Sequence, residues 1–227
     1  MLRRFDRLPR RMQNPAVKRY YDILKKKQAS MVLKRLFDVT ASAILIVLLS
    51  PVMAAIAVLI KMDSPGPVLF RQVRVTQYGR QFRICKFRTM VDKAESLGGQ
   101  VTTSGDMRVT RIGKKLRGCR LDELPQLFNV LMGDMTFVGT RPEVVRYVRA
   151  YTDEMTATLL LPAGITSEAS ILYKDEERLM TDAQNADQVY IEQVLPGKMA
   201  YNLKSLKDFD FLSDIRTMIR TVFAVIR

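Results

Sequence analysis

The sequence predicts an α/β protein that is mostly helical with a small β-hairpin or sheet, and that has a re-entrant membrane helix beside a cytoplasmic domain with interfacial amphipathic helices. Three observations predict this class. The first is a long charge-free run broken by proline, and the second is a pair of strand-like runs around a glycine turn. The third is a set of segments with apolar residues at helical spacing. With 227 residues, 48% of them hydrophobic, the chain is long enough to bury a core.

Composition excludes several kinds of chemistry. Lysine and arginine number 37 against 23 acidic residues, a net charge of +14, which favours phosphates, anionic lipid headgroups or nucleic acid as partners. Because histidine is absent, a Ser-His-Asp triad, a Cys-His pair and a His-ligated zinc site are excluded. The two cysteines, Cys85 and Cys119, argue against a disulfide scaffold and fit a reducing, cytoplasmic setting.

The charge divides the chain into segments. Residues 1–38 carry 12 basic and 3 acidic side chains, residues 39–70 are neutral, residues 71–120 carry 13 basic and 3 acidic, and residues 121–227 carry 11 basic and 16 acidic. We therefore expect a basic N-terminal arm (1–30), a membrane helix (31–61) and a cytoplasmic domain (62–227). The acidic part begins abruptly at Asp122 and Glu123, so this junction is the first place to look for chemistry.

Residues 15–37, within and just after the arm, mix aromatic and aliphatic side chains with lysine and arginine. This mixture predicts a basic interfacial helix lying on a membrane surface. A solvated charged arm is the alternative.

The membrane segment runs from Val39 to Ile60 without a charged residue, and as a helix it would be about 33 Å long, enough to cross a bilayer. Both flanks are basic, which favours a cytoplasmic location for both ends. Ser50 and Pro51 lie near the middle, where proline removes a backbone donor and predicts a sharp kink. A helix that enters, bends and returns satisfies both observations; a kinked single-pass helix is the alternative.

Further elements follow in chain order. Two runs rich in β-branched and aromatic residues predict a hairpin around Tyr78-Gly79, and residues 90–97 and 111–116 read as short helices with a mobile loop at 98–105. Leucine and phenylalanine at helical spacing predict an apolar helix face over 121–131. A similar stripe over 211–226 is either a core helix or one lying on the headgroup layer.

The segment around Asp122 and Glu123 is the most informative. Pro125 is tolerated only in the first turn of a helix, so both carboxylates lie at or just before a helix start, where the dipole favours anions. Ordinary helix capping would explain the pair alone. A crowd of basic residues around it favours a site for a phosphorylated ligand instead: Arg108, Arg111, Lys114, Lys115, Arg117, Arg120 and Arg141.

An ordered set of motifs covers most of the chain: KRLFDV at 34–39, SPGPVLFRQ at 64–72, KFRTM at 86–90, LDELPQLFNVLMGDM at 121–135 and VGTRPE at 138–143. In this order they resemble the bacterial sugar transferases, monotopic phosphoglycosyl transferases that initiate glycan assembly. Thr140, where members usually have proline, and RVTQYG, where they usually have RVG, depart from the pattern without removing a reactive group.

The resemblance implies a re-entrant helix, a cytoplasmic catalytic domain on the bacterial inner membrane, an Asp-Glu dyad at Asp122 and Glu123, and a need for Mg²⁺. It implies a UDP-sugar and a polyprenol (undecaprenyl) phosphate as substrates, in the first step of exopolysaccharide, capsule, O-antigen or glycoprotein synthesis.

Within this framework we expect Asp122 to be the nucleophile on the β-phosphorus, forming an aspartyl phosphosugar and releasing UMP. Glu123 is expected to ligate Mg²⁺. Four arginines are candidate phosphate clamps, because guanidinium groups bind phosphate bidentately: Arg88, Arg117, Arg120 and Arg141.

Two other functions remain open at this stage. Asp208-Phe209-Asp210 has the form of a D-x-D metal motif, so a glycosyltransferase using a nucleotide sugar is one alternative. A membrane-tethered nucleic-acid binder is the other, although basic residues interleaved with stacking aromatics in a known module are missing, so we expect no nucleic-acid partner. The oligomeric state is open, a homo-oligomer included.

Overall fold

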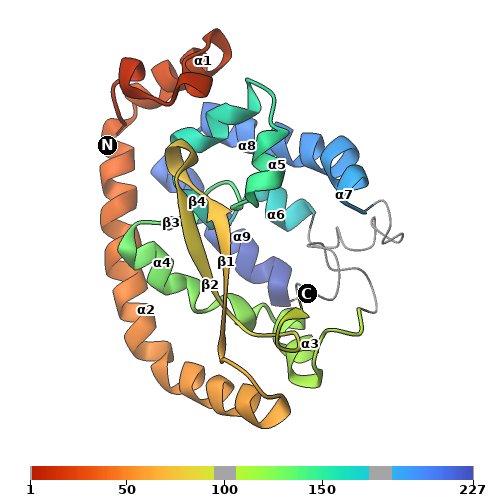
Figure 1. Cartoon of the computed structure of the whole chain (residues 1–227). Coiled ribbons are helices and arrows are strands. Elements are labelled where there is room, and N and C mark those ends of the chain that lie inside the picture. The colour runs from red at the N-terminus through yellow and green to blue at the C-terminus, as the bar shows by residue number, and fades with distance from the viewer. Residues whose placement is uncertain (1, 95–105, 174–185, 227) are drawn as a thin grey trace.

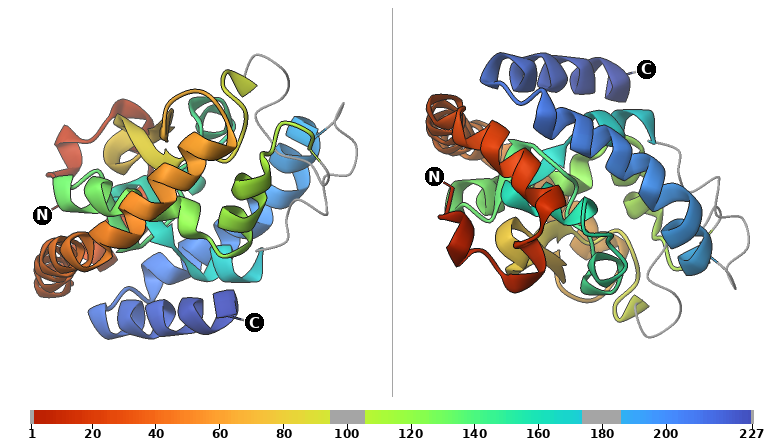
Figure 2. Two further views of the ribbon diagram at one scale, coloured as in Figure 1. Left: turned by 90° about the horizontal axis from the view of Figure 1, so that it is seen from below. Right: turned by 90° about the horizontal axis from the view of Figure 1, so that it is seen from above.

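The predicted membrane segment forms helix α2, Gln28–Asp63, in the computed structural model, which describes residues 2–94, 106–173 and 186–226. The helix is continuous through Pro51 but bends, so that its two halves point in different directions (Figure 2). Pro51 has no N–H to donate to the Val47 carbonyl, and the Ser50 hydroxyl donates to that carbonyl instead at 2.8 Å. The predicted break is therefore a bend that leaves the helix intact.

In its most apolar window α2 has a mean hydropathy of 2.9, and only 11% of that window is buried within the protein. Its length and composition are sufficient to cross a membrane. Several large apolar side chains along the helix face outward, among them Ile44, Val47, Leu48 and Val58.

The predicted hairpin is confirmed. Strands β1, Leu69–Val75, and β2, Gln81–Phe87, pair antiparallel around the short helix η3, Gln77–Gly79. Tyr78 (φ 60°) and Gly79 (φ 76°) both take up left-handed backbone in this tight turn. A second sheet, which the sequence analysis did not predict, pairs β3, Met135–Val138, parallel with β4, Ala163–Thr166.

Helices surround the two sheets (Figure 1). The first to follow the hairpin in the chain are α3, Arg111–Gly118, η5, Leu121–Glu123, and α4, Gln126–Met132, and the last two pack against β2. The remaining helices are α5, Val145–Arg149; η6, Met155–Leu160; α6, Glu168–Leu172; α7, Ala186–Val189; the π-helix η8, Tyr190–Val194; α8, Leu195–Lys207; and α9, Phe211–Ile226.

Two of the local predictions need correction. The predicted helix at 90–97 is not formed over its described part, because Met90 makes an isolated antiparallel bridge with Val109 and Lys93 has φ 57° in a turn. Residues 95–97 and the predicted loop at 98–105 lie outside the described residues. The predicted apolar face at 121–131 is split between η5 and α4, and of its side chains only Leu127 is fully buried.

The N-terminal arm packs onto the rest of the chain. It contains η1, Phe5–Arg7, η2, Arg10–Met12, and α1, Pro15–Lys25. The apolar face of α1 is buried against η6 and the end of α8: Val17, Tyr20, Tyr21 and Leu24. The aromatic face predicted to lie on a membrane is thus used in the protein core, because η6 and α8 offer it an apolar surface that sequence periodicity does not reveal.

The apolar stripe predicted over residues 211–226 forms helix α9, and its described side chains are only partly buried. Phe211, Ile215 and Met218 are half-buried, whereas other apolar side chains in the described part of α9 are exposed: Leu212, Ile219, Val222 and Phe223. The exposed side chains give α9 an apolar outer edge, and its placement on the headgroup layer stays a prediction.

Candidate functional site

The described residues form a cavity of about 490 Å³. Its walls come from both strands of the hairpin, the segment after β2, α3, η5, the segment before α5, η8 and α8. Nine of the lining residues are basic and three acidic, so the cavity suits an anionic ligand. The basic ones are Arg71, Arg74, Lys86, Arg88, Lys93, Arg108, Arg117, Arg141 and Lys198, and the acidic ones are Asp92, Asp122 and Glu143.

The short helix η5 brings Asp122 and Glu123 to this cavity. Arg120 precedes η5 in the left-handed conformation (φ 53°) and turns the chain out of α3, while Pro125 caps the start of α4. Both carboxylate residues are buried, at 7% and 8% exposure. Their predicted position just before a helix start is confirmed, and of the two Asp122 lines the cavity.

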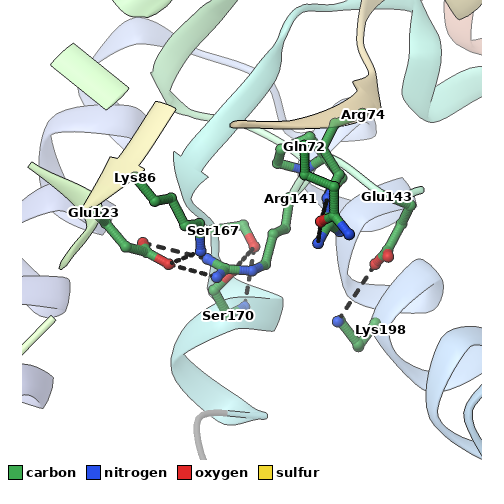
Figure 3. A network of polar contacts seen from close by, with 10 residues as sticks. Gln72, Arg74, Lys86, Glu123, Arg141, Glu143, Ser167, Ser170 and Lys198 are labelled. Carbon is green, nitrogen blue, oxygen red and sulfur yellow. Dashed lines mark hydrogen bonds and ion pairs between the residues drawn. The ribbon is translucent and has the colours of Figure 1, made fainter. Parts of the chain in front are cut away.

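Glu123 is held by two cations. Its Oε1 accepts from Lys86 Nζ at 2.9 Å and from Arg141 Nη2 at 2.5 Å (Figure 3). Burial alone would raise the pKa of Glu123, but Arg141 and Lys86 outweigh it and hold the pKa far below the usual range. The two cations therefore favour the ionised form of Glu123.

Asp122 has the opposite shift. Burial raises its pKa above the usual value, although Lys86, Arg117 and Arg141 oppose the effect. Desolvation lowers the pKa of Lys86, and the nearby Glu123 opposes that shift. The arrangement places one carboxylate in a cation-lined cavity and a second one behind it that fixes two of those cations.

The four predicted arginine clamps have different positions. Arg141 and Arg117 line the cavity, whereas Arg120 is not among its lining residues. Arg88 also lines it but is buried, and its terminal nitrogens donate to the carbonyls of Ser64, at 2.7 Å, and Pro65. Its Nε is buried without a hydrogen-bond partner among the described residues. In this structure Arg88 fixes the segment that follows α2.

Sequence reasoning missed several lining residues. Lys86 lies in KFRTM and Glu143 in VGTRPE, so the motifs held a signal for both. Lys198 lies in α8 and Tyr190 in the π-helix η8, a rare element often found at functional sites. No pattern in the sequence marks either, because only the fold brings α8 to the cavity.

The D-x-D alternative finds no support in the geometry. Asp208-Phe209-Asp210 lies between α8 and α9, and none of the three residues lines the cavity. Phe209 is buried, and Asp210 accepts from the Leu212 N–H at 3.1 Å at the start of α9.

The side chains present at the site limit how Mg²⁺ could be held. Among the described residues, no three His, Cys, Asp or Glu side chains gather as a metal site. Mg²⁺ in proteins is commonly held by one or two carboxylates, with the remaining positions taken by water and substrate phosphates. Asp122 lines the cavity and is the carboxylate open to such an ion, whereas Glu123 does not line the cavity and is paired with Lys86 and Arg141.

Together, fold and site define a protein with an apolar helix of membrane length and a cation-lined cavity suited to a phosphorylated ligand. The chain belongs to the bacterial sugar transferase family, whose sequence model matches residues 29–227.

Three relatives illustrate the similarity. The chain is 39% identical over 197 residues to a UDP-N-acetylgalactosamine-undecaprenyl-phosphate N-acetylgalactosaminephosphotransferase of Aeromonas hydrophila, covering 86% of this chain and 44% of the relative. It is 36% identical over 197 residues to a UDP-glucose:undecaprenyl-phosphate glucose-1-phosphate transferase of Klebsiella pneumoniae, covering 86% of this chain and 40% of the relative. A putative undecaprenyl-phosphate N-acetylgalactosaminyl 1-phosphate transferase of Bacillus subtilis is 35% identical over 164 residues, 72% of this chain and 86% of that protein. The chain thus spans less than half the length of the first two relatives.

Proposed function

We propose that this protein transfers a sugar 1-phosphate from a UDP-sugar to undecaprenyl phosphate and releases UMP, as the first step of surface glycan synthesis. The observation that carries the proposal is a buried carboxylate, Asp122, in a cavity whose lining is dominated by cations. The names of the relatives support the same substrates, a UDP-sugar and undecaprenyl phosphate.

In the proposed mechanism Asp122 is the catalytic nucleophile. A carboxylate oxygen attacks the β-phosphorus of the UDP-sugar, the bond from that phosphorus to the bridging oxygen breaks, and UMP leaves with the bond's electrons. An oxygen of undecaprenyl phosphate then attacks the same phosphorus and displaces the Asp122 carboxylate. The glycosidic carbon takes no part, so the anomeric configuration is retained.

The cations around Asp122 have two tasks in this mechanism. They reduce the repulsion between an anionic nucleophile and an anionic diphosphate, and they stabilise charge that develops at phosphorus. Arg141 and Lys86 are positioned for this by Glu123, and Arg117 lies near enough to lower the pKa of Asp122. Mg²⁺ held by Glu123 or Asp122 would supply further neutralisation of the diphosphate.

We also propose that α2 is re-entrant and that the protein is monotopic on the cytoplasmic face of the inner membrane. Near the N-terminal end of α2, Lys34 Nζ pairs with Asp214 of α9 at 2.5 Å, and Asp38 accepts from Thr136 of β3 at 2.6 Å. At the other end, Asp63 accepts from the Ile112 N–H of α3 at 2.9 Å.

These contacts attach both ends of α2 to one folded unit. A straight helix spanning a bilayer would separate its ends by about 30 Å of hydrocarbon, so it could not keep both sets of contacts. A bent helix that returns to the side it entered keeps both.

The direct test is a panel of UDP-sugars, UDP-glucose and UDP-N-acetylgalactosamine among them, incubated with undecaprenyl phosphate and protein held in nanodiscs. We expect UMP release with at least one donor, its loss when EDTA removes Mg²⁺, and its return when Mg²⁺ is added back. Formation of a glycosidic bond with release of UDP instead would contradict the proposal. Undiminished activity in exhaustively chelated protein would remove the metal from it.

A further inference from the structure

The end of the cavity away from the Glu123–Lys86 pair has a polar wall of its own (Figure 3). It consists of three buried side chains, Glu143, Tyr190 and Lys198, each no more than 5% exposed. The Tyr190 hydroxyl donates to Glu143 Oε1 at 2.5 Å, and Lys198 Nζ donates to the Tyr190 hydroxyl at 2.8 Å. Lys198 Nζ also lies 3.5 Å from Glu143 Oε1. The mechanism above uses none of the three.

The backbone on which Glu143 sits is fixed to strand β1. The Val75 N–H donates to the Glu143 carbonyl at 3.0 Å, and an Arg74 guanidinium nitrogen donates to the Pro142 carbonyl at 3.1 Å. The contacts of the Glu143 side chain given above all go to Oε1; within the part of the chain that the structure describes, no donor is recorded for Oε2. Because Glu143 lines the cavity, the wall offers a ligand a rigidly held carboxylate oxygen.

The charge of this wall indicates the kind of group it would bind. The Glu143 carboxylate and the Lys198 ammonium are close enough to offset each other, so the wall attracts phosphate far less than the cations around Asp122 do. A carboxylate oxygen accepts hydrogen bonds only, and hydroxyl groups are the common uncharged donors in a nucleotide sugar. Carboxylates recognise ribose hydroxyls in this way in dinucleotide-binding folds.

The stability of the folded protein does not by itself explain why Glu143, Tyr190 and Lys198 form a buried polar cluster. A buried ion pair is on average no more stabilising than apolar residues of equal volume, so its presence beside a cavity calls for another explanation.

We propose that Glu143, positioned by Tyr190 and Lys198, binds a hydroxyl group of the nucleotide sugar through Oε2 and thereby contributes to donor specificity. The inference rests on the proposed function, which supplies the nucleotide sugar. The hydroxyl belongs either to the ribose or to the transferred sugar, and the two sources have the same hydrogen-bonding chemistry.

The test variant is Glu143→Gln. The amide oxygen can replace Oε1 as acceptor for Tyr190 and Lys198, while the amide nitrogen takes the place of Oε2 and cannot accept a hydrogen bond. The matched control is Glu154→Gln, because Glu154 also accepts from a tyrosine, Tyr20, at 2.6 Å but does not line the cavity. Tyr190→Phe, which removes the hydroxyl that holds Glu143, is a second variant should Glu143→Gln fold poorly.

Two measurements distinguish the sources of the hydroxyl: Kd for UMP and 2′-deoxy-UMP, and KM and kcat for whichever of UDP-glucose and UDP-N-acetylgalactosamine the wild type uses. A ribose 2′-hydroxyl at Oε2 predicts about tenfold weaker UMP binding in Glu143→Gln, with 2′-deoxy-UMP little changed. A 3′-hydroxyl predicts the same loss for both nucleotides. A hydroxyl of the transferred sugar predicts unchanged UMP binding and a KM about tenfold higher at similar kcat.

The inference is overturned if Glu143→Gln and Tyr190→Phe match Glu154→Gln in Kd, KM and kcat while the wild type binds UMP and turns over its donor. That result would leave the proposed function standing. A wild type that binds neither UMP nor a UDP-sugar would contradict both.

Discussion

Asp122 and Glu123 are neighbours in the chain with opposite pKa shifts. Burial raises the pKa of Asp122, whereas Arg141 and Lys86 more than offset burial at Glu123 and lower its pKa. Carboxyl groups whose surroundings separate their pKa values in this way usually have different roles. Glu123 pairs with two cations, and Asp122 lines the cavity, where we propose that it meets the ligand.

Replacing Glu123 by glutamine should destabilise the protein. The variant leaves Lys86 and Arg141 without their shared anion, and removing one partner of a buried ion pair typically costs about 3–5 kcal/mol. Because the folded pKa of Glu123 is lowered, its contribution is present above the unfolded pKa and is lost only as the pH falls through the folded value. The free energy of unfolding at pH 7 therefore measures the full effect.

The control for that measurement is Glu168→Gln. Glu168 pairs with Arg220 at 2.9 Å on the surface, where such pairs contribute about 1 kcal/mol or less. Equal, small losses in the two variants would show that Glu123 does not organise the cations.

Lys86 should set the acidic limit of activity. Asp122 must be ionised to attack phosphorus, so kcat/KM should fall as the pH drops through its pKa, which burial raises above the usual value of an aspartate. Lys86→Gln removes the cation that most lowers this pKa, and the acidic limb should move to higher pH. A pH profile of the variant with the limb unmoved would show that another group titrates.

At the scale of elements, α2 is defined by the contacts at its ends. Arg35 adds to the anchoring by donating to the carbonyls of Val130, at 2.8 Å, and Leu131, at 3.0 Å, near the end of α4. The exposed apolar middle of the helix lies between two anchored ends. The re-entrant topology that we propose for α2 rests on this arrangement.

Topology can be tested by labelling single cysteines in a variant without Cys85 and Cys119. Gln28 and Gln81 are exposed and lie on either side of the apolar run, and we expect both positions to be labelled only from the cytoplasm. Adding Pro51→Leu and Ser50→Ala removes the bend and should expose position 28 to the periplasm in part of the molecules. Periplasmic labelling of position 28 without those two changes would establish a single-pass anchor instead.

At the scale of the whole molecule, the sequence predicts those structural features that depend on residues close together in the chain. The hairpin, α3 and the place of Asp122 before a helix follow from turn residues, periodicity and proline. The parallel pairing of β3 with β4 does not, because their partners lie 28 residues apart in the chain, as Met135 and Ala163 do. Docking of α1 was missed for a related reason: amphipathic spacing shows which face is buried but not what buries it.

In the candidate site, too, some residues can be predicted from the sequence and others can be found only from the fold. Asp122 and Arg141 could be found from the charge pattern and the motifs, because each lies in a short motif that contains few other candidate site residues. The ion pair between Glu123 and Lys86 joins residues 37 apart, and Lys198 reaches the cavity from a helix near the end of the chain. Their roles depend on the fold bringing distant charges together.

The central claim is that Asp122 forms a covalent bond with the phosphosugar, and intact-mass spectrometry of the protein tests it most directly. Wild-type protein mixed with a UDP-sugar and Mg²⁺, without undecaprenyl phosphate, should gain the mass of one sugar phosphate, and subsequent addition of undecaprenyl phosphate should remove it. Asp122→Asn should show no adduct and no turnover, because an amide is a poor nucleophile at phosphorus. Full turnover by Asp122→Asn, with deamidation excluded by peptide mass, would contradict the account.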